Sequence, residues 1–214
     1  GGELLTEDHT PLLDSKEAQE VTELYETLIH DKQTTDPSMG TANASTTGPY
    51  LENFANGRTA MIIMANWWES ALKDSMGDEF ENIKTAPIPV GPSGTSPHSV
   101  SYSWLTVVNA KSDEAQQEAA WKFLKWLNSG ESGENSSSAM GDILMSMGIV
   151  PSRYSDIEAH SERLSTPFLD SYVQELENAK PFPIVLGGNE LITTLQKQIE
   201  AMEFGGANAK EAME

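Results

Sequence analysis

The stretch from Ala55 to Ser70 constrains the fold of this chain more than any other part of its sequence. It starts at the end of a short helix expected over 49–56, and Gly57 is placed to close that helix in the left-handed conformation. The apolar run over 59–64 has the length of a buried strand. We therefore expect a helix, a tight turn and a buried strand in succession.

A second helix is expected directly after this strand. Asn66 is the candidate N-cap, and Glu69 stands three positions later, which makes an Asn-x-x-Glu variant of the capping box. Trp67 and Trp68 then occupy the first turn of that helix. In an open α/β sheet, ligands bind in the crevice where strands end and helices begin. The two indoles are therefore placed where a ligand would lie.

The charge of the chain excludes one class of partner. Its 33 acidic and 13 basic residues give a formal net charge of −20, which repels nucleic acids and anionic lipids. We expect the acidic side chains to lie on solvated helix faces, and adaptation to high salt is the alternative, since ions screen such repulsion. The sequence has no cysteine, which excludes thiol catalysis and zinc-thiolate sites.

The beginning of the chain indicates a piece of a longer protein. It opens with Gly1-Gly2 without methionine, and it shows no basic-then-apolar leader. No run approaches the roughly 20 apolar residues that a membrane-spanning helix needs. A chain of 214 residues still has the length to bury a sizeable core.

Cap residues and apolar spacing predict four further helices. Their expected N-terminal residues are Asp14, Ser112, Thr166 and Asn189. On the second of these helices, over 113–128, we expect Trp121 and Trp126 to pack in the core.

Extended structure is expected between the helices. Residues 4–13 indicate a short hairpin, and the composition of 31–48 indicates a long polar surface loop. The prolines of 83–90 forbid a helix and favour an edge strand, which 91–94 ends in a turn. Residues 99–108 are rich in β-formers and indicate a second strand.

Several of these elements resemble those of one known family. The string Phe54-Ala-Asn-Gly-Arg-Thr-Ala-Met61, followed by Trp67, resembles the signature of the extracellular solute-binding proteins of ABC importers, in the sugar-binding group related to maltose-binding protein. Ala65 stands where that family usually has glycine. Further family elements are resembled, in the same order, by Ala86-Pro-Ile-Pro-Val-Gly-Pro-Ser-Gly94, by residues 119–127 and by Gly148-Ile-Val-Pro-Ser-Arg153.

The resemblance implies an α/β fold, the type II fold of periplasmic binding proteins, with a mixed sheet flanked by helices and with the N-terminal half of the family fold missing. Segment 1–102 would be the first segment of the C-terminal lobe and 147–214 its second. Segment 103–146 would be a crossing strand and helix that belong to the N-terminal lobe. We expect the missing half, or a second copy of this chain, to cover 103–146, because an uncovered apolar edge aggregates.

The resemblance also implies a sugar site in which an indole stacks on the apolar face of a sugar ring. Trp67 corresponds to the stacking tryptophan of the family, and Trp104 lies close to a Gly-Gly-Trp site that several sugar binders use. The expected ligand-binding residues are Trp67, Trp104, Asn66, Tyr102, Trp68, Gly187, Asn189 and Arg153. For each of them, ordinary packing, capping or ion pairing is the alternative.

Signatures of catalysis are missing from the sequence. The four histidines lie far apart and none forms an H-E-x-x-H motif, so we expect no metal site. The P-loop, dinucleotide-binding and Gly-x-Ser-x-Gly motifs are missing too. Asp74, Asp78 and Glu79 lack the spacing of a calcium loop. We therefore expect a binding protein without catalytic residues or cofactor, and not an enzyme.

The expected function is that of the extracytoplasmic substrate-binding component of an ABC importer, periplasmic or lipid-anchored at the cell surface. It would capture a mono- or oligosaccharide by closing two lobes around it and would deliver it to the membrane subunits of the importer. Three alternatives stay open. They are an accessory domain of a secreted carbohydrate-active enzyme, a binding protein for a polyol or a peptide, and a purely structural surface domain.

Overall fold

The computed structural model describes residues 2–37 and 48–214, and the chain forms two compact units. Unit 1 comprises Gly1–Ile62, Ile88–Ser101 and Asn178–Glu214. Unit 2 comprises Ile63–Pro87 and Tyr102–Glu177. Each unit is built from segments that are far apart in the sequence, because the chain passes between the units several times.

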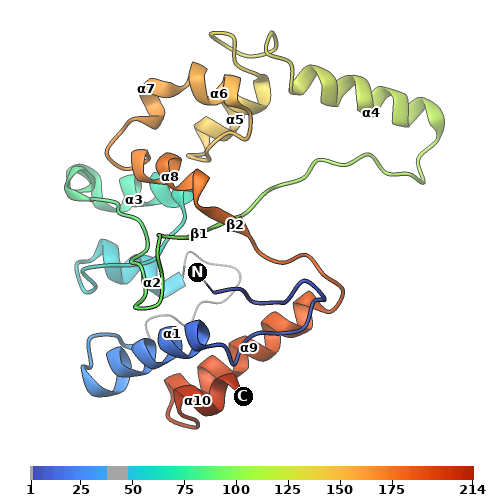
Figure 1. The fold of residues 1–214 in the computed structure, drawn as a ribbon. Helices are drawn as coiled ribbons and strands as arrows, with labels where there is room; N and C mark the ends of the chain where they lie inside the picture. The colour runs from blue at the N-terminus through green and yellow to red at the C-terminus, as the bar shows by residue number, and fades with distance from the viewer. Residues whose placement is uncertain (1, 38–47) are drawn as a thin grey trace. The chain divides into compact units, whose positions relative to one another are not determined.

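The helices of the described residues account for most of the regular structure (Figure 1). Unit 1 contains α1 (Lys16–Glu26), a π-helical turn over Thr27–Asp31, α2 (Gly48–Ala55), α9 (Gly188–Glu203) and α10 (Ala209–Met213). Unit 2 contains α3 (Glu69–Met76), α4 (Glu114–Leu127), α5 (Ala139–Ser146), α6 (Tyr154–Ala159), α7 (Ser161–Leu164) and α8 (Asp170–Gln174), with short 3-10 turns over Asn66–Trp68, Gly77–Asn82 and Glu175–Glu177. Within the described part of the chain, none of these helices has the length and apolarity to cross a membrane.

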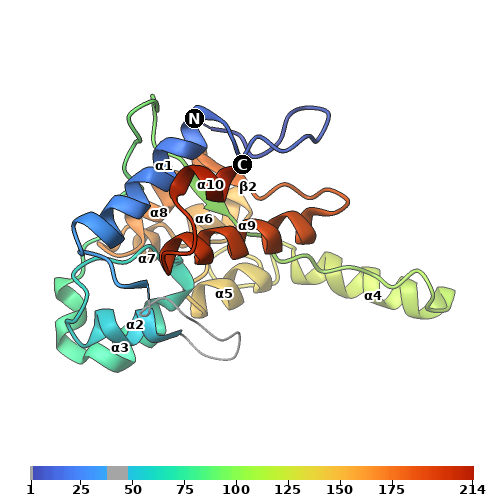
Figure 2. The same cartoon turned by 90° about the horizontal axis from the view of Figure 1, so that it is seen from below.

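The core of unit 1 lies where α1 and α9 meet α10. Met202 of α9 and Met213 of α10 are buried, and Tyr25 of α1 packs against them. The hydroxyl of Tyr25 donates a 2.6 Å hydrogen bond to the carboxylate of Glu203, and burial together with this carboxylate raises the pKa of Tyr25 to about 12. Figures 1 and 2 show the three helices side by side in two views.

The start of the chain follows the sequence prediction closely. An antiparallel bridge between Leu5 and Pro11 confirms the short hairpin. The helix after it begins one residue later than predicted, because Ser15 and not Asp14 is the N-cap and accepts a hydrogen bond from the N–H of Ala18. The predicted polar loop over 31–48 falls mostly outside the described residues.

The sheet of the described residues is much smaller than the sequence predicts. It consists of β1 (Ser99–Ser101) and β2 (Ala179–Pro181), which pair in parallel. The strand predicted over 99–108 is confirmed only at Ser99–Ser101, and 102–108 forms no ladder. The extended segments predicted over 59–64 and 83–90 form no ladder either, so they are not strands of this chain. A strand needs a neighbour to accept and donate its backbone hydrogen bonds. None of the described segments pairs with these three.

The core of unit 2 surrounds α3 and the segment before α8. Leu72 and Leu169 are fully buried, and the ring of Phe168 lies 5.3 Å from that of Phe80, centroid to centroid. The helix predicted to begin at Thr166 begins at Asp170, after a turn. Burial of this aromatic and aliphatic group is the main source of stability that the unit has.

A buried aspartate fastens the loop before α5 to α6. Asp156 of α6 is 1% exposed and accepts hydrogen bonds from the backbone N–H of Ser138 at 2.8 Å and from its hydroxyl at 2.7 Å. Nearby, Asp142 accepts from the hydroxyl of Ser137 and lies 2.9 Å from Nε2 of His160. The hydrogen bond from Ser137 is the main reason that the pKa of Asp142 lies below its usual value.

Helix α4 leaves much of its apolar side chain surface uncovered in the described chain. Asp113, and not the predicted Ser112, is its N-cap. Leu127 is buried, but Trp121, Phe123 and Trp126 are 54%, 56% and 54% exposed. The described part of this chain therefore does not supply the packing predicted for the two tryptophans, and the cover predicted for 103–146 stays a prediction.

Removing the carboxylate of Asp156 should destabilise unit 2. Asp156→Ala leaves the N–H and the hydroxyl of Ser138 buried without their acceptor, which we expect to cost about 2–4 kcal/mol of unfolding free energy. All five tryptophans lie in unit 2, so urea denaturation followed by tryptophan fluorescence reports this unit alone. Glu158→Ala, an exposed acid on the same helix, is the control. Equal midpoints for the two variants would contradict this account.

The exposed aromatic surface of α4 should drive association of the 214-residue chain. Sedimentation velocity over a range of concentrations should show self-association that Trp126→Glu weakens, since a charge cannot be buried without a partner. Ser155→Glu adds a negative charge at an exposed position of α6, outside α4, and should leave the association unchanged. A folded wild-type chain that stays monomeric at every concentration would refute the prediction.

Candidate functional site

The two indoles singled out by the sequence lie on a corner of the backbone. Asn66–Trp68 is a single 3-10 turn whose N-cap is Ala65, and α3 begins at Glu69. The predicted capping box is wrong, because the side chain of Asn66 caps neither the 3-10 turn nor α3. Trp67 and Trp68 are both half-buried. The corner itself is present as predicted, although no strand leads into it.

Trp67 meets a second predicted ligand-binding residue, Tyr102. Their ring centroids lie 6.2 Å apart with an interplanar angle of 79°, an edge-to-face contact. Tyr102 is 68% exposed and Trp104 is 82% exposed. Since Trp104 follows Tyr102 by two residues, their Cα atoms lie within about 7 Å. We call Trp67, Tyr102 and Trp104 the aromatic surface of unit 2.

Such a surface has a definite chemical capacity. A flat aromatic face that is partly open to water gains by covering an apolar face of similar size, and the polar edge of Tyr or Trp can hydrogen-bond beside it. Sugar rings offer an apolar face ringed by hydroxyls. The exposed rings of Tyr102 and Trp104 can therefore cover an apolar face of a ligand.

The side chain of Asn66 links the corner to the backbone that follows α5. Its Nδ2 donates a 3.0 Å hydrogen bond to the carbonyl oxygen of Gly148, the residue that follows the C-cap of α5. The φ of Gly148 is +73°, and a Cβ at this position would lie 3.3 Å from Oε2 of Glu69. Glycine at 148 therefore allows both the left-handed turn and the close approach.

Glu69, directly after the two indoles, is a buried anion. It is 1% exposed, its Oε1 lies 2.9 Å from Nζ of Lys73, and its Oε2 accepts a hydrogen bond from Arg163 of α7. Burial raises the pKa of Glu69, but the hydrogen bonds and charges of Arg163 and Lys73 outweigh burial, and the pKa lies below its usual value. The carboxylate is therefore ionised wherever the chain is folded near neutral pH.

A third contact holds the residue before the corner. The hydroxyl of Tyr172, on α8, donates a 3.2 Å hydrogen bond to the carbonyl oxygen of Met64. Burial raises the pKa of Tyr172 to about 12, so the hydroxyl keeps its proton. The side chain of Tyr172 also packs against Phe168, with ring centroids 5.8 Å apart.

The remaining predicted residues belong to other elements of the chain. Arg153 is half-buried and donates to the carbonyl oxygen of Asn128 at the C-terminal end of α4. Gly187 and Asn189 belong to unit 1. Gly187, with a φ of +81°, is the N-cap of α9, so the predicted capping by Asn189 is wrong. Asn189 is exposed as the second residue of that helix.

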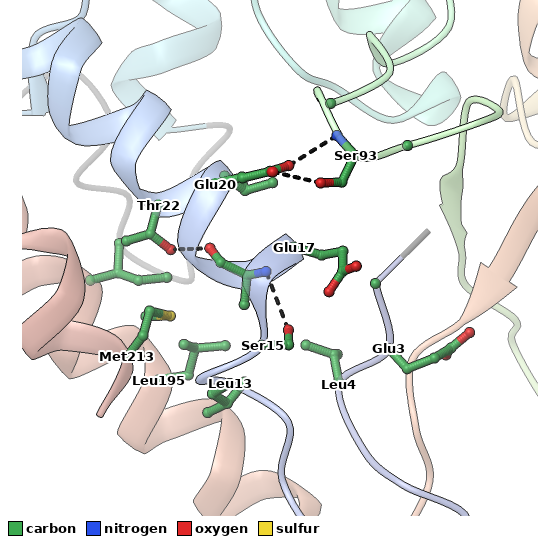
Figure 3. A pocket seen from close by; sticks show the side chains of 16 residues that line it. Glu3, Leu4, Leu13, Ser15, Glu17, Glu20, Thr22, Ser93, Leu195 and Met213 are labelled. Carbon is green, nitrogen blue, oxygen red and sulfur yellow. Dashed lines mark hydrogen bonds between the residues drawn. The ribbon is translucent and has the colours of Figure 1, made fainter.

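Unit 1 contains a cavity of about 340 Å³ that none of the predicted residues lines (Figure 3). Its floor is apolar and includes Leu13, Leu195 and Met213. At its edge the carboxylate of Glu20 accepts hydrogen bonds from the N–H and the hydroxyl of Ser93. The cavity lies among α1, α9 and α10, and it offers no aromatic face, so we do not assign the predicted sugar site to it.

Sequence reasoning missed the residues that hold the corner. The sequence predicts Glu69 in a capping box. The spacing of four residues between Glu69 and Lys73 is the local sign of an ion pair instead. Arg163 and Tyr172 lie 94 and 108 positions away from their partners, and no local pattern connects them. Among the described residues, no group of three or more His, Asp and Glu side chains could hold a metal ion.

Comparisons with known proteins identify a family and a fold for this chain. The family model for bacterial extracellular solute-binding proteins matches residues 1–134. A solved structure, maltose-bound MalE3 of T. maritima, has the same fold with a TM-score of 0.78 at 22% identity. The match covers 100% of this chain and 52% of that one, so the chain spans about half the length of that protein. No curated protein is similar to it in sequence.

These matches confirm the expected α/β fold as a partial one, with a small open sheet among many helices. The family match covers more than half of the chain and includes the corner with Trp67, together with Tyr102 and Trp104. This chain belongs to the family of bacterial extracellular solute-binding proteins.

Proposed function

We propose that this chain is part of an extracytoplasmic receptor that binds a mono- or oligosaccharide and delivers it to the membrane subunits of an ABC importer. The observation that carries the proposal is the edge-to-face contact of Trp67 with the exposed Tyr102, beside the exposed Trp104, in a chain of the solute-binding family. The structurally similar MalE3 was solved with maltose, which supports a sugar as the ligand class.

The proposed mechanism is binding without chemical change. One lobe, formed by segments 1–102 and 147–214, would close with a second lobe around the sugar, and segment 103–146 would belong to that second lobe. The ligand would favour the closed state because only that state presents both sets of contacts to it. Trp67 would stack on one face of the sugar ring with Tyr102 at its edge, while polar side chains of the second lobe would hydrogen-bond its hydroxyls.

The uncovered apolar residues of unit 2 support this assembly. Leu105 and Val107 are 81% and 78% exposed, and the aromatic residues of α4 are about half exposed. Single exposed apolar side chains are common, but several on neighbouring elements are typical of a surface that another polypeptide covers. The proposed cover is the half of the receptor that this chain does not contain, or a second copy of the chain.

Binding should depend on the Trp67 indole. In the full-length receptor, Trp67→Ala should weaken oligosaccharide binding about 30-fold, which corresponds to about 2 kcal/mol for a central aromatic contact. Isothermal titration with maltose and maltotriose, chosen after a thermal-shift screen of mono- and oligosaccharides, measures this loss. Tyr154→Ala removes an aromatic ring that is 91% exposed on α6 and should bind like wild type.

Each outcome decides between the candidate functions. Unchanged affinity in Trp67→Ala would remove the proposed site. Binding of peptides or polyols, with no response to any sugar, would leave a solute-binding receptor but refute the ligand class. Release of shortened products from a labelled oligosaccharide would show an enzyme and overturn the proposal as a whole.

A further inference from the structure

The corner that carries Trp67 contains little that could orient an indole by itself. Residues 59–65 form no regular element, and the 3-10 turn after them is three residues long. The hydrogen bond from the N–H of Trp68 to the carbonyl of Ala65 is long, at 3.4 Å. The contacts that hold the backbone on either side of Trp67 therefore decide the direction in which its side chain leaves the chain.

Three elements of unit 2 that are distant in the sequence hold this backbone in place. Before the turn, Tyr172 of α8 bonds the carbonyl of Met64. Within the turn, Asn66 bonds the carbonyl of Gly148 after α5. Directly after the turn, the carboxylate of Glu69 pairs with Arg163 of α7. Trp67 thus lies between contacts that reach residues 64, 66 and 69, and its own ring stays free to meet Tyr102.

Glu69 and Gly148 join these contacts into one cluster. A Cβ on residue 148 would lie 3.3 Å from the Glu69 carboxylate and 3.6 Å from the carbonyl oxygen of Asn66. The backbone after α5 therefore packs directly against both ends of the turn. Any side chain at 148 would have to push the turn, the carboxylate or α5 away.

A buried carboxylate is a costly way to fill a core position. An apolar side chain of similar volume would avoid the desolvation penalty, so a buried ion pair is weak evidence for stability. A carboxylate differs from an apolar side chain because its two oxygens accept in fixed directions. Here Oε1 is directed to Lys73 and Oε2 to Arg163, which come from two elements. The pair therefore fixes the orientation of the first turn of α3.

We propose that Glu69 and Gly148 are positioning residues for Trp67, which set the indole in its binding orientation before any ligand arrives. The consequence for ligand affinity rests on the proposed function, whereas the geometric claim does not. Preorganisation of this kind raises affinity because the backbone that carries the ring has less freedom to lose on binding.

The orientation of Trp67 can be read without a ligand. The 214-residue chain is labelled with 5-fluorotryptophan, and the ¹⁹F signal of Trp67 is assigned by its loss in Trp67→Phe. In Glu69→Gln and in Gly148→Ala this signal should shift by more than its line width or broaden. The signals of Trp121 and Trp126 on α4 should stay at their wild-type positions.

Acid supplies a second readout on the wild-type chain. Since the pKa of Glu69 in the folded chain lies below its usual value of 4.5, its ion pairs are intact above about pH 4.5 and are lost as the pH falls further. The charged groups facing the carboxylate are Arg163 and Lys73. The Trp67 signal should therefore move below pH 4.5, and Glu69→Gln should abolish that transition.

Two further variants separate positioning from stability. Asp156→Ala weakens the same unit at a site that does not touch the corner, and it should leave the Trp67 signal of the folded state unchanged. Arg163→Lys keeps the charge but loses the planar, directional donor, and it should move the signal less than Glu69→Gln. Arg163→Lys also tests the proposal if Glu69→Gln fails to fold.

The results that would overturn the positioning role differ from those that would overturn the proposed function. A Trp67 signal that keeps its position in Gly148→Ala and Arg163→Lys, or that moves equally in Asp156→Ala, would overturn the positioning role. A shifted signal in a receptor that binds no sugar would uphold positioning and refute the sugar site. In a receptor that binds maltotriose, Glu69→Gln should weaken binding while Asp156→Ala retains wild-type affinity.

Discussion

The buried carboxylate of Glu69 is the interaction on which the architecture of unit 2 depends most. It lies at the start of α3, and it receives Arg163 from α7 while Gly148 after α5 packs against it. Segments separated by about a hundred residues thereby meet at one point. Since an ion excluded from water must have its partners in place, this cluster admits few alternative arrangements. The aromatic surface is carried by the backbone that the cluster holds.

The second constraint on this chain is the hydrogen-bonding demand of extended backbone. β1 and β2 satisfy each other as a parallel pair, whereas the apolar segments at 59–64 and 102–108 have no strand beside them among the described residues. Met61 and Ile63 are at least 80% exposed as a result. This pattern is expected of a fold in which another polypeptide segment supplies part of the sheet. It agrees with a chain that spans about half the length of MalE3.

The distribution of functional features between the units has a physical meaning. Unit 2 carries all five tryptophans and the aromatic surface, and unit 1 carries the compact group of α1, α9 and α10 around Met202 and Met213. Each unit therefore has a core of its own, and in unit 2 the anchors around Trp67 fix the backbone that carries the aromatic surface.

The sequence by itself determined the local features of this protein: the family, the hairpin at the start, the helices with their apolar stripes, the left-handed Gly57 and the corner bearing Trp67. These follow from residues a few positions apart, and cap or turn chemistry acts over that distance. Only the tertiary structure decided that Glu69 forms a buried ion pair instead of a cap, that Tyr102 meets Trp67, and that Arg153 serves the end of α4. It also decided which apolar runs become strands, because a strand needs a hydrogen-bonded neighbour that its own sequence does not specify.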